Sequence, residues 1–255
     1  MNFGKLCLFG LLTLIAACSA PAENRPPPAG INIVTVMGAV HGQHRRSESY
    51  SLTVLQKAIK KFDPDIIMVE LPPERFAIAS ANYEQFGEVR ESRTDDFPEL
   101  IDVVFPLRQE LGFEMVPVAA WTQKIADDRR AVLAQLESNP MRVKDWAKFQ
   151  AAAASYNKAV RGRSDDPVFI HNKTYDNAVK ARQDIYEELF GDDLGSGGWK
   201  NINVAHYQKI AAALEEVRGQ EQRILILYGA WHKYWFLEQL ETRDDIQLVD
   251  AADLF

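Results

Sequence analysis

The segments IVTVMGAVH (33–41) and ILILYGAWH (224–232) repeat one arrangement: a mostly apolar run, then Gly-Ala, one further residue and a histidine. Each run has the length and composition of a buried parallel strand. Glycine directly after a strand lets the backbone turn tightly, which leaves the histidine at the strand's carboxyl end. Ligands of open α/β sheets bind at that edge. We therefore expect His41 and His232 to belong to one site.

Further short, Val/Ile/Leu-rich runs predict the rest of a sheet. Between the early runs, apolar residues recur at helical spacing over 49–62 and 97–111. This alternation indicates right-handed crossovers and an α/β fold with a mostly parallel, doubly wound sheet. The expected strands are 33–37, 65–71, 113–118, 223–228 and 246–249.

The middle of the chain, about 121–219, contains amphipathic stretches and no convincing strand. We interpret it as a helical cap inserted before the last two strands. A separate helical domain is the alternative, but the last strands need the first three to complete a core. One domain over 31–255 is therefore preferred. The helical stretches are 124–136, 143–160, 174–190 and 202–217, with breaks at 139–140, 162–167 and 191–198.

The first residues predict export and lipid anchoring. Residues 1–17 combine Lys5 with an apolar run of about twelve residues, too short to span a bilayer, which takes about 20. The run ends in LIAAC, which is similar to a bacterial lipobox and implies lipid on Cys18; an ordinary cleaved secretory signal at Ala17–Ala20 is the alternative. Because Ser19 follows the cysteine, we expect the periplasmic side of the outer membrane.

Residues 18–30 would form a Pro-rich tether between this anchor and the domain. Cys7 lies in the discarded signal and Cys18 would carry lipid, so the mature chain has no thiol for catalysis or metal binding. The net charge is −7, and no Lys/Arg-dense run appears. These features argue against a nucleic-acid partner; the oligomeric state stays open.

A carboxylate follows the second predicted strand. Glu70 closes the apolar run IIMV, and a carboxylate there is costly to bury without a cation, a metal or hydrogen-bond donors. An exposed strand end neutralised by Arg75 is the alternative. His41, His232 and Glu70 together form a donor set used by catalytic zinc sites, which also suits manganese, cobalt or iron. We assign these three residues as ligands of a divalent metal and as catalytic groups.

Weaker candidates surround these three residues. His44 would contact substrate or metal, although a loop histidine is more often solvent-facing. Glu48 would move protons, or simply favour a helix dipole. Arg75 would bind a substrate carboxylate if it does not pair with Glu70. Asn203 is a substrate-binding candidate on a helical stretch, where the alternative is a polar side chain that simply faces solvent.

The order of these motifs resembles the TraB/GumN/Tiki superfamily, which is related to the haem-binding ChaN lipoproteins and the erythromycin esterases. The resemblance covers about 32–255 and rests on GAVH (38–41, the first box), IIMVELPPER (66–75) and GAWH (229–232, the second box). It places the family's box histidines on His41 and His232 and its acidic residue on Glu70.

Two departures from the family pattern stand near the second box. Family members often carry an Arg-Asn pair in the preceding helix; Asn203 matches the asparagine, and the arginine is missing. Trp231 and Lys233 stand where similar proteins have smaller residues.

The resemblance implies a hydrolase-like fold that serves metal-dependent peptidases, metal-free esterases or haem-binding proteins. We expect a lipid-anchored, metal-dependent hydrolase of peptides or small-molecule esters, the metal lowering the pKa of a bound water. The alternatives are a haem- or metal-uptake lipoprotein without catalysis, a metal-free esterase with His41 as base and Glu70 as its partner, and a purely structural member of the fold.

Overall fold

A computed structural model of the chain describes residues 29–91, 94 and 96–255. The expected signal (1–17), Cys18 and all but the last two residues of the expected tether lie outside the described residues. Among the helices that the structure describes, none has the length and apolarity needed to cross a membrane.

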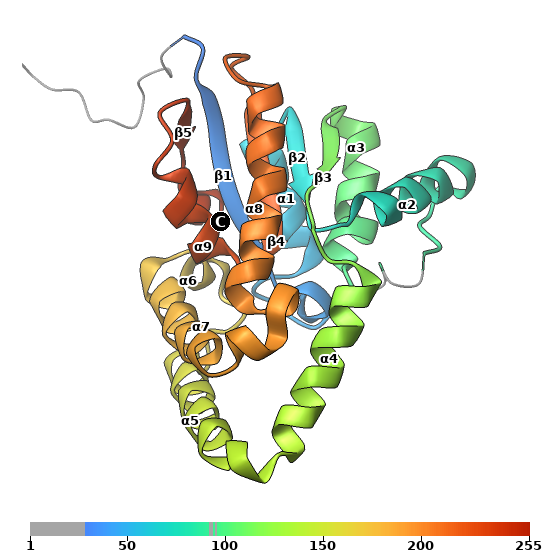
Figure 1. The fold of residues 1–255 in the computed structure, drawn as a ribbon. Helices are drawn as coiled ribbons and strands as arrows, with labels where there is room; N and C mark the ends of the chain where they lie inside the picture. Colours follow the sequence, from blue (N-terminus) through green and yellow to red (C-terminus); the bar gives the residue numbers. More distant parts are fainter. Residues whose placement is uncertain (1–28, 92–93, 95) are drawn as a thin grey trace, which may run out of the picture.

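The core of the fold is one sheet of five parallel strands in the order β3-β2-β4-β1-β5 (Figure 1). Every predicted strand is present, and the α/β fold class is confirmed. β4 pairs with both β1 and β2, so the centre of the sheet is completed by a strand that follows the helical cap. The strands are β1 (Asn32–Ala39), β2 (Ile66–Val69), β3 (Glu114–Pro117), β4 (Arg223–Gly229) and β5 (Ile246–Leu248).

Helices cover both faces of the sheet, which explains why the strands lack polar alternation. One face packs against α1, a π-helix η3 and α3, and the other against α8 and α9. Ser51 caps α1 by accepting a hydrogen bond from the Val54 N–H. The bounds are α1 (Leu52–Phe62), η3 (Glu99–Val104), α3 (Phe105–Leu111), α8 (Trp199–Glu216) and α9 (Lys233–Leu240).

One long helix was not predicted. α2 (Pro73–Phe86) begins with proline in its first turn, where the missing N–H costs nothing, and ends at Gly87. Of its residues only Ala79 is fully buried. A helix that buries so little shows no clear apolar stripe in the sequence, which is why periodicity missed it.

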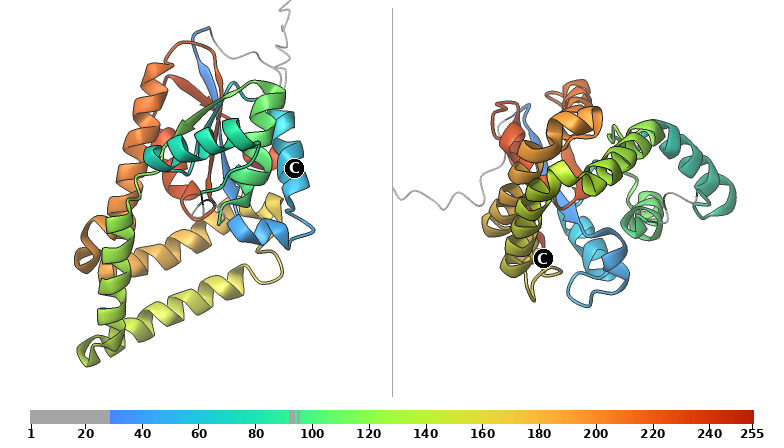
Figure 2. Two further views of the ribbon diagram at one scale, coloured as in Figure 1. Left: turned by 90° about the vertical axis from the view of Figure 1, so that its right-hand side faces the viewer. Right: turned by 60° about the horizontal axis from the view of Figure 1, so that its bottom comes forward.

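The helical cap extends beyond the carboxyl ends of the strands (Figures 1 and 2). α5 and α7 run side by side, and α4 meets α5 at an angle at the tip farthest from the sheet. A small apolar cluster around Tyr186 and Phe190 holds α7 to α4 and α5. The cap helices are α4 (Gln123–Ser138), α5 (Val143–Ala159), α6 (Pro167–Ile170) and α7 (Lys173–Leu194). Three of them match the predicted stretches 124–136, 143–160 and 174–190, whereas α6 was not predicted and the stretch 202–217 forms α8 on the sheet.

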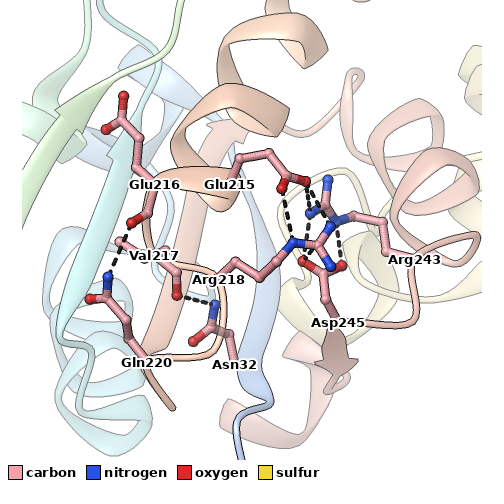
Figure 3. A network of polar contacts seen from close by, with 8 residues as sticks. All are labelled: Asn32, Glu215, Glu216, Val217, Arg218, Gln220, Arg243 and Asp245. Carbon is pink, nitrogen blue, oxygen red and sulfur yellow. Dashed lines mark hydrogen bonds and ion pairs between the residues drawn. The ribbon is translucent and has the colours of Figure 1, made fainter.

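A polar network fastens the opposite end of the sheet (Figure 3). The Arg243 guanidinium donates to both carboxylate oxygens of Asp245, at 2.8 and 2.6 Å, and to Glu215 at 2.7 Å. Arg218 pairs with the same Glu215. The buried Asn32 amide donates to the Val217 carbonyl at 2.9 Å. These contacts tie the end of α8 to the first residues of β1 and β5, far from the two boxes.

Candidate functional site

The two boxes interlock at the carboxyl edge of the sheet. Ala39 is in register with Gly229, and its carbonyl accepts the Ala230 N–H at 2.9 Å. A Cβ placed on Gly38 would lie 2.9 Å from the Ala230 Cα. A Cβ on Gly229 would lie 2.8 Å from His41 Nε2. Each box therefore needs its glycine because the other box occupies the space where a side chain would be.

His41 lies between two carboxylates. Its Nδ1 is 2.7 Å from Glu99 Oε1, and its Nε2 is 3.8 Å from Glu70 Oε2. Burial lowers the pKa of His41, but the hydrogen bond to Glu99 and the charges of Glu70, Glu99 and Asp96 outweigh it and raise the pKa to about 9. Its side chain is still 37% exposed, so a ligand can reach the ring. Without a bound ligand, the ring is an imidazolium at neutral pH.

Glu70 is buried next to His41. Its Oε2 accepts the Gly229 N–H at 2.6 Å. Burial raises the pKa of Glu70 to about 7, against the opposing effects of His41 and this hydrogen bond. Arg75 does not neutralise it: Arg75 pairs with Glu91, although it lines the same small cavity of about 210 Å³ as Glu70. The strand-end carboxylate is thus buried and can change its protonation near neutral pH.

His232 is buried and neutral. Its Nδ1 lies 2.7 Å from Asn203 Oδ1, and the Asn203 amide nitrogen donates to the Trp199 carbonyl. Because the amide oxygen can only accept, His232 Nδ1 carries the proton and Nε2 keeps a lone pair. Burial, with the nearby His206 and His41, holds the pKa of His232 well below its usual range. Asn203 thus sets the tautomer of the second histidine.

His41 and His232 line one cavity of about 340 Å³ between the sheet edge and the cap. The structure therefore brings the two box histidines together as predicted. Glu70 does not line this cavity; it lines the neighbouring cavity of about 210 Å³ and approaches the His41 ring at 3.8 Å. Within the described residues, no group of three or more His, Cys, Asp or Glu side chains is already spaced to hold a metal ion.

Glu99 is a site residue that sequence reasoning missed. It lies in the stretch 97–111, which was read only for its apolar spacing, and it is buried. Its Oε1 accepts a hydrogen bond from His41 Nδ1, while Oε2 has no hydrogen-bond partner among the described residues. The local helix is π-helical, a geometry that often marks functional positions. The available signal was a carboxylate flanked by the apolar residues Leu100 and Val103 on the core side of a helix.

Two of the weaker candidates lie outside the site. His44 is buried, its Nδ1 bonded to the Tyr50 carbonyl at 2.8 Å and its Nε2 accepting the Val40 N–H at 3.0 Å. With both ring nitrogens engaged by the backbone, His44 is neither solvent-facing nor free to bind a ligand. Glu48 is exposed before α1, and none of the described contacts joins it to His41 or Glu70.

Lys233, one of the departures from the family pattern, has a structural role. Its buried ammonium donates to both carboxylate oxygens of Asp176 at 2.6 Å. Burial lowers the pKa of Lys233, and Asp176 opposes the shift. The pair ties the first residue of α9 to α7 and so holds the second box against the cap. Trp231, the other departure, lines the cavity in front of His232.

His171, for which the sequence indicated no role, supports the first box through a hydrogen bond. Its Nε2 accepts the Gly38 N–H at 2.8 Å, and its Nδ1 bonds the Pro167 carbonyl at 2.6 Å. One nitrogen must accept and the other must donate, so only the neutral ring satisfies both bonds. Burial, reinforced by the charge of Lys233, lowers the pKa of His171 to about 3.

We expect the protein to lose stability as the pH falls from about 6.5 towards 3. In this window the unfolded chain binds a proton at His171 and the folded chain does not, so acid favours unfolding by up to about 1.4 kcal/mol per pH unit. Melting temperatures at pH 7 and pH 4.5 check this. His171→Gln should melt lower at pH 7 but show a smaller drop between the two values. An equal drop in the variant would contradict the assignment.

Comparison with protein-family models, with curated proteins and with solved structures found no match to this chain. The resemblance to the TraB/GumN/Tiki superfamily therefore stays a prediction.

Proposed function

We propose that this protein is a hydrolase whose centre is a divalent metal held by His41, His232 and Glu70. The observation that carries the proposal is the hydrogen bond at Nδ1 of each of the two histidines. Each has its Nδ1 bonded to a side-chain oxygen, from Glu99 and Asn203 respectively, so Nε2 is the nitrogen through which each would bind a metal. Histidine ligands of metals in proteins are usually oriented in this way by an outer hydrogen bond.

The donor set fits such an ion chemically. Two imidazole nitrogens and one carboxylate, without sulfur, suit zinc, manganese, cobalt or iron. His41 would have to give up the proton on Nε2, and Glu99 would continue to accept the hydrogen bond from Nδ1. When bound, a divalent ion lowers the pKa of water and polarises a carbonyl group.

Glu70 can bind the metal through one of its carboxylate oxygens. The Gly229 N–H holds one oxygen of Glu70 and leaves the other available to a ligand. With its pKa raised to about 7 in the metal-free protein, Glu70 can release its proton at neutral pH and so bind the ion as a carboxylate. Peptides and small-molecule esters are the substrates that this chemistry serves.

A metal-free hydrolase is the second candidate, and one observation favours it. His41 Nε2 and Glu70 Oε2 lie 3.8 Å apart, with pKa values raised to about 9 and about 7. Such a pair supplies an acid and a base near neutral pH. The protonated His41 would act as the acid and Glu70 as the base, the reverse of the roles expected from the sequence. Lipid anchoring at Cys18 in the bacterial envelope and haem binding stay predictions.

Metal content tests the proposal. Plasma mass spectrometry of the purified protein should find about one Zn, Mn, Co or Fe per chain. His232→Ala should lose the ion while its circular dichroism spectrum is unchanged. Glu48→Gln is the matched control, because this glutamate is exposed and outside the site; it should keep the ion. A wild-type protein without metal, or equal occupancy in His232→Ala, would contradict the metal centre. Hydrolysis that survives a strong chelator would then select the metal-free enzyme.

A further inference from the structure

We propose that the cavity in front of His41 and His232 binds an uncharged, flat ring system of the substrate. This deepens the proposed function by naming a substrate class. None of the described residues that line the cavity is Asp, Glu, Lys or Arg. The lining consists of aromatic rings, small apolar side chains, the two histidines, Gln43 and Ser164.

Trp231 and Trp199 present ring surface to the cavity because their indole N–H groups are already bonded. Trp231 Nε1 donates to the Tyr156 hydroxyl at 2.9 Å, and Trp199 Nε1 donates to the Tyr234 hydroxyl at 2.8 Å. The Tyr175 hydroxyl lies 3.5 Å from that of Tyr156. Because both indole N–H groups are engaged, the surface that the two tryptophans leave for a ligand is apolar ring. Such a surface favours stacked or edge-on contact with another ring.

The same rings are held in place and adjoin the candidate reactive groups. The Tyr156 ring meets Trp231 edge-on, with centroids 5.4 Å apart, and the Arg182 guanidinium lies 4.5 Å from the centroid of the Trp231 ring. Trp199 stacks on the His232 ring at 4.6 Å. Because Tyr156 and Tyr175 belong to α5 and α7, the cap helices would decide which ring systems the site accepts.

A charged substrate group would be disfavoured in this cavity. It would lose its hydration and find no oppositely charged lining residue other than His41. His41 is already paired with Glu99 and lies beside Glu70. In the metal-free protein, a carboxylate entering from the cavity would therefore meet two carboxylates behind His41, the only cationic residue of the described lining, whereas a neutral ring meets none of these costs.

Two probes that differ only in charge test the inference. Titration calorimetry of the purified protein, kept metal-free with a chelator, with naphthalene-2-carboxamide and with naphthalene-2-carboxylate should show the neutral probe binding about tenfold more tightly or better. Trp231→Leu should weaken carboxamide binding about fivefold, and Trp231→Phe should retain most of it. Phe86→Leu, which changes an exposed ring on α2, is the control and should have no effect.

Equal or tighter binding of the carboxylate, no binding of the carboxamide, or an equal loss in Phe86→Leu would overturn the inference. The comparison of the two probes needs only wild-type protein, so it decides the matter even if a variant fails to fold. Carboxamide binding without hydrolysis of any naphthyl ester would keep this inference and count against the proposed function. The two failures can therefore be told apart.

Discussion

Replacing Gly229 with alanine should lower the kcat/KM of the proposed hydrolysis by about 100-fold, since small displacements of reacting groups have effects of that size. The new Cβ would lie 2.8 Å from His41 Nε2 and 3.1 Å from Glu70 Oε2. Both groups would have to move away from the strand end, because the Gly229 backbone is held in the sheet. The same crowding should cost about 1–3 kcal/mol in the free energy of unfolding. Steady-state kinetics and urea denaturation measure the two effects.

Gly42→Ala is the matched control for this substitution. Gly42 directly follows His41, yet a Cβ there would meet no atom within 4 Å. Its activity and unfolding free energy should stay close to the wild-type values. If Gly229→Ala behaves like Gly42→Ala, the absence of a side chain at Gly229 is not needed to position His41 and Glu70. The close packing of the two boxes would then have no effect on activity.

Glu99→Gln should lower the pKa of His41 from about 9 towards the ordinary value for histidine. The amide can still accept a hydrogen bond from Nδ1, but it no longer supplies the negative charge that stabilises the imidazolium. In the metal-free protein at pH 8, His41 is therefore mainly charged in the wild type and mainly neutral in the variant. NMR titration of the His41 ring protons measures the shift directly. The proposed hydrolytic activity should fall about 10- to 100-fold, the usual effect of losing an outer partner of a metal-ligating histidine.

Asp102→Asn is the control for this experiment. Asp102 lies on the same π-helix but is half-exposed and pairs with Arg45, so its loss should leave the His41 titration midpoint where it is. A midpoint that is equally unchanged in Glu99→Gln would mean that Glu99 merely fills space. A shifted midpoint with unchanged activity would show that the charge on His41 does not matter for the reaction.

The central prediction about the site rested on one sequence motif that occurs twice in the chain. Parallel strands end at one edge of a sheet, so two strand–Gly-Ala-x-His segments were expected to meet there, and His41 and His232 do share a cavity. The strand order could not be read from the sequence. β4 lies between β1 and β2, and in this order the Gly229 N–H holds Glu70 at 3.8 Å from the His41 ring.

The roles of individual polar residues were much less predictable. Asn203 was proposed as a substrate contact and proves to orient His232. Arg75 pairs with Glu91 rather than Glu70. From the sequence alone, His44 and His171 could both be taken for metal ligands. In the structure, both ring nitrogens of each histidine are hydrogen-bonded to backbone groups. Such assignments require knowing which backbone groups lie within hydrogen-bond distance.

Local sequence patterns were thus sufficient for the fold class, the strands and the placement of the two histidines at one edge. These depend on apolar runs, glycine turns and the periodicity of neighbouring residues, all of which are visible within about ten residues. The tertiary structure alone decided the proton positions on the histidines, the isolation of Glu70 from Arg75 and the part played by Glu99. Glu99 lies 58 residues from His41 in the chain, and its effect exists only because folding buries both groups together, where the loss of water strengthens every charge and hydrogen bond.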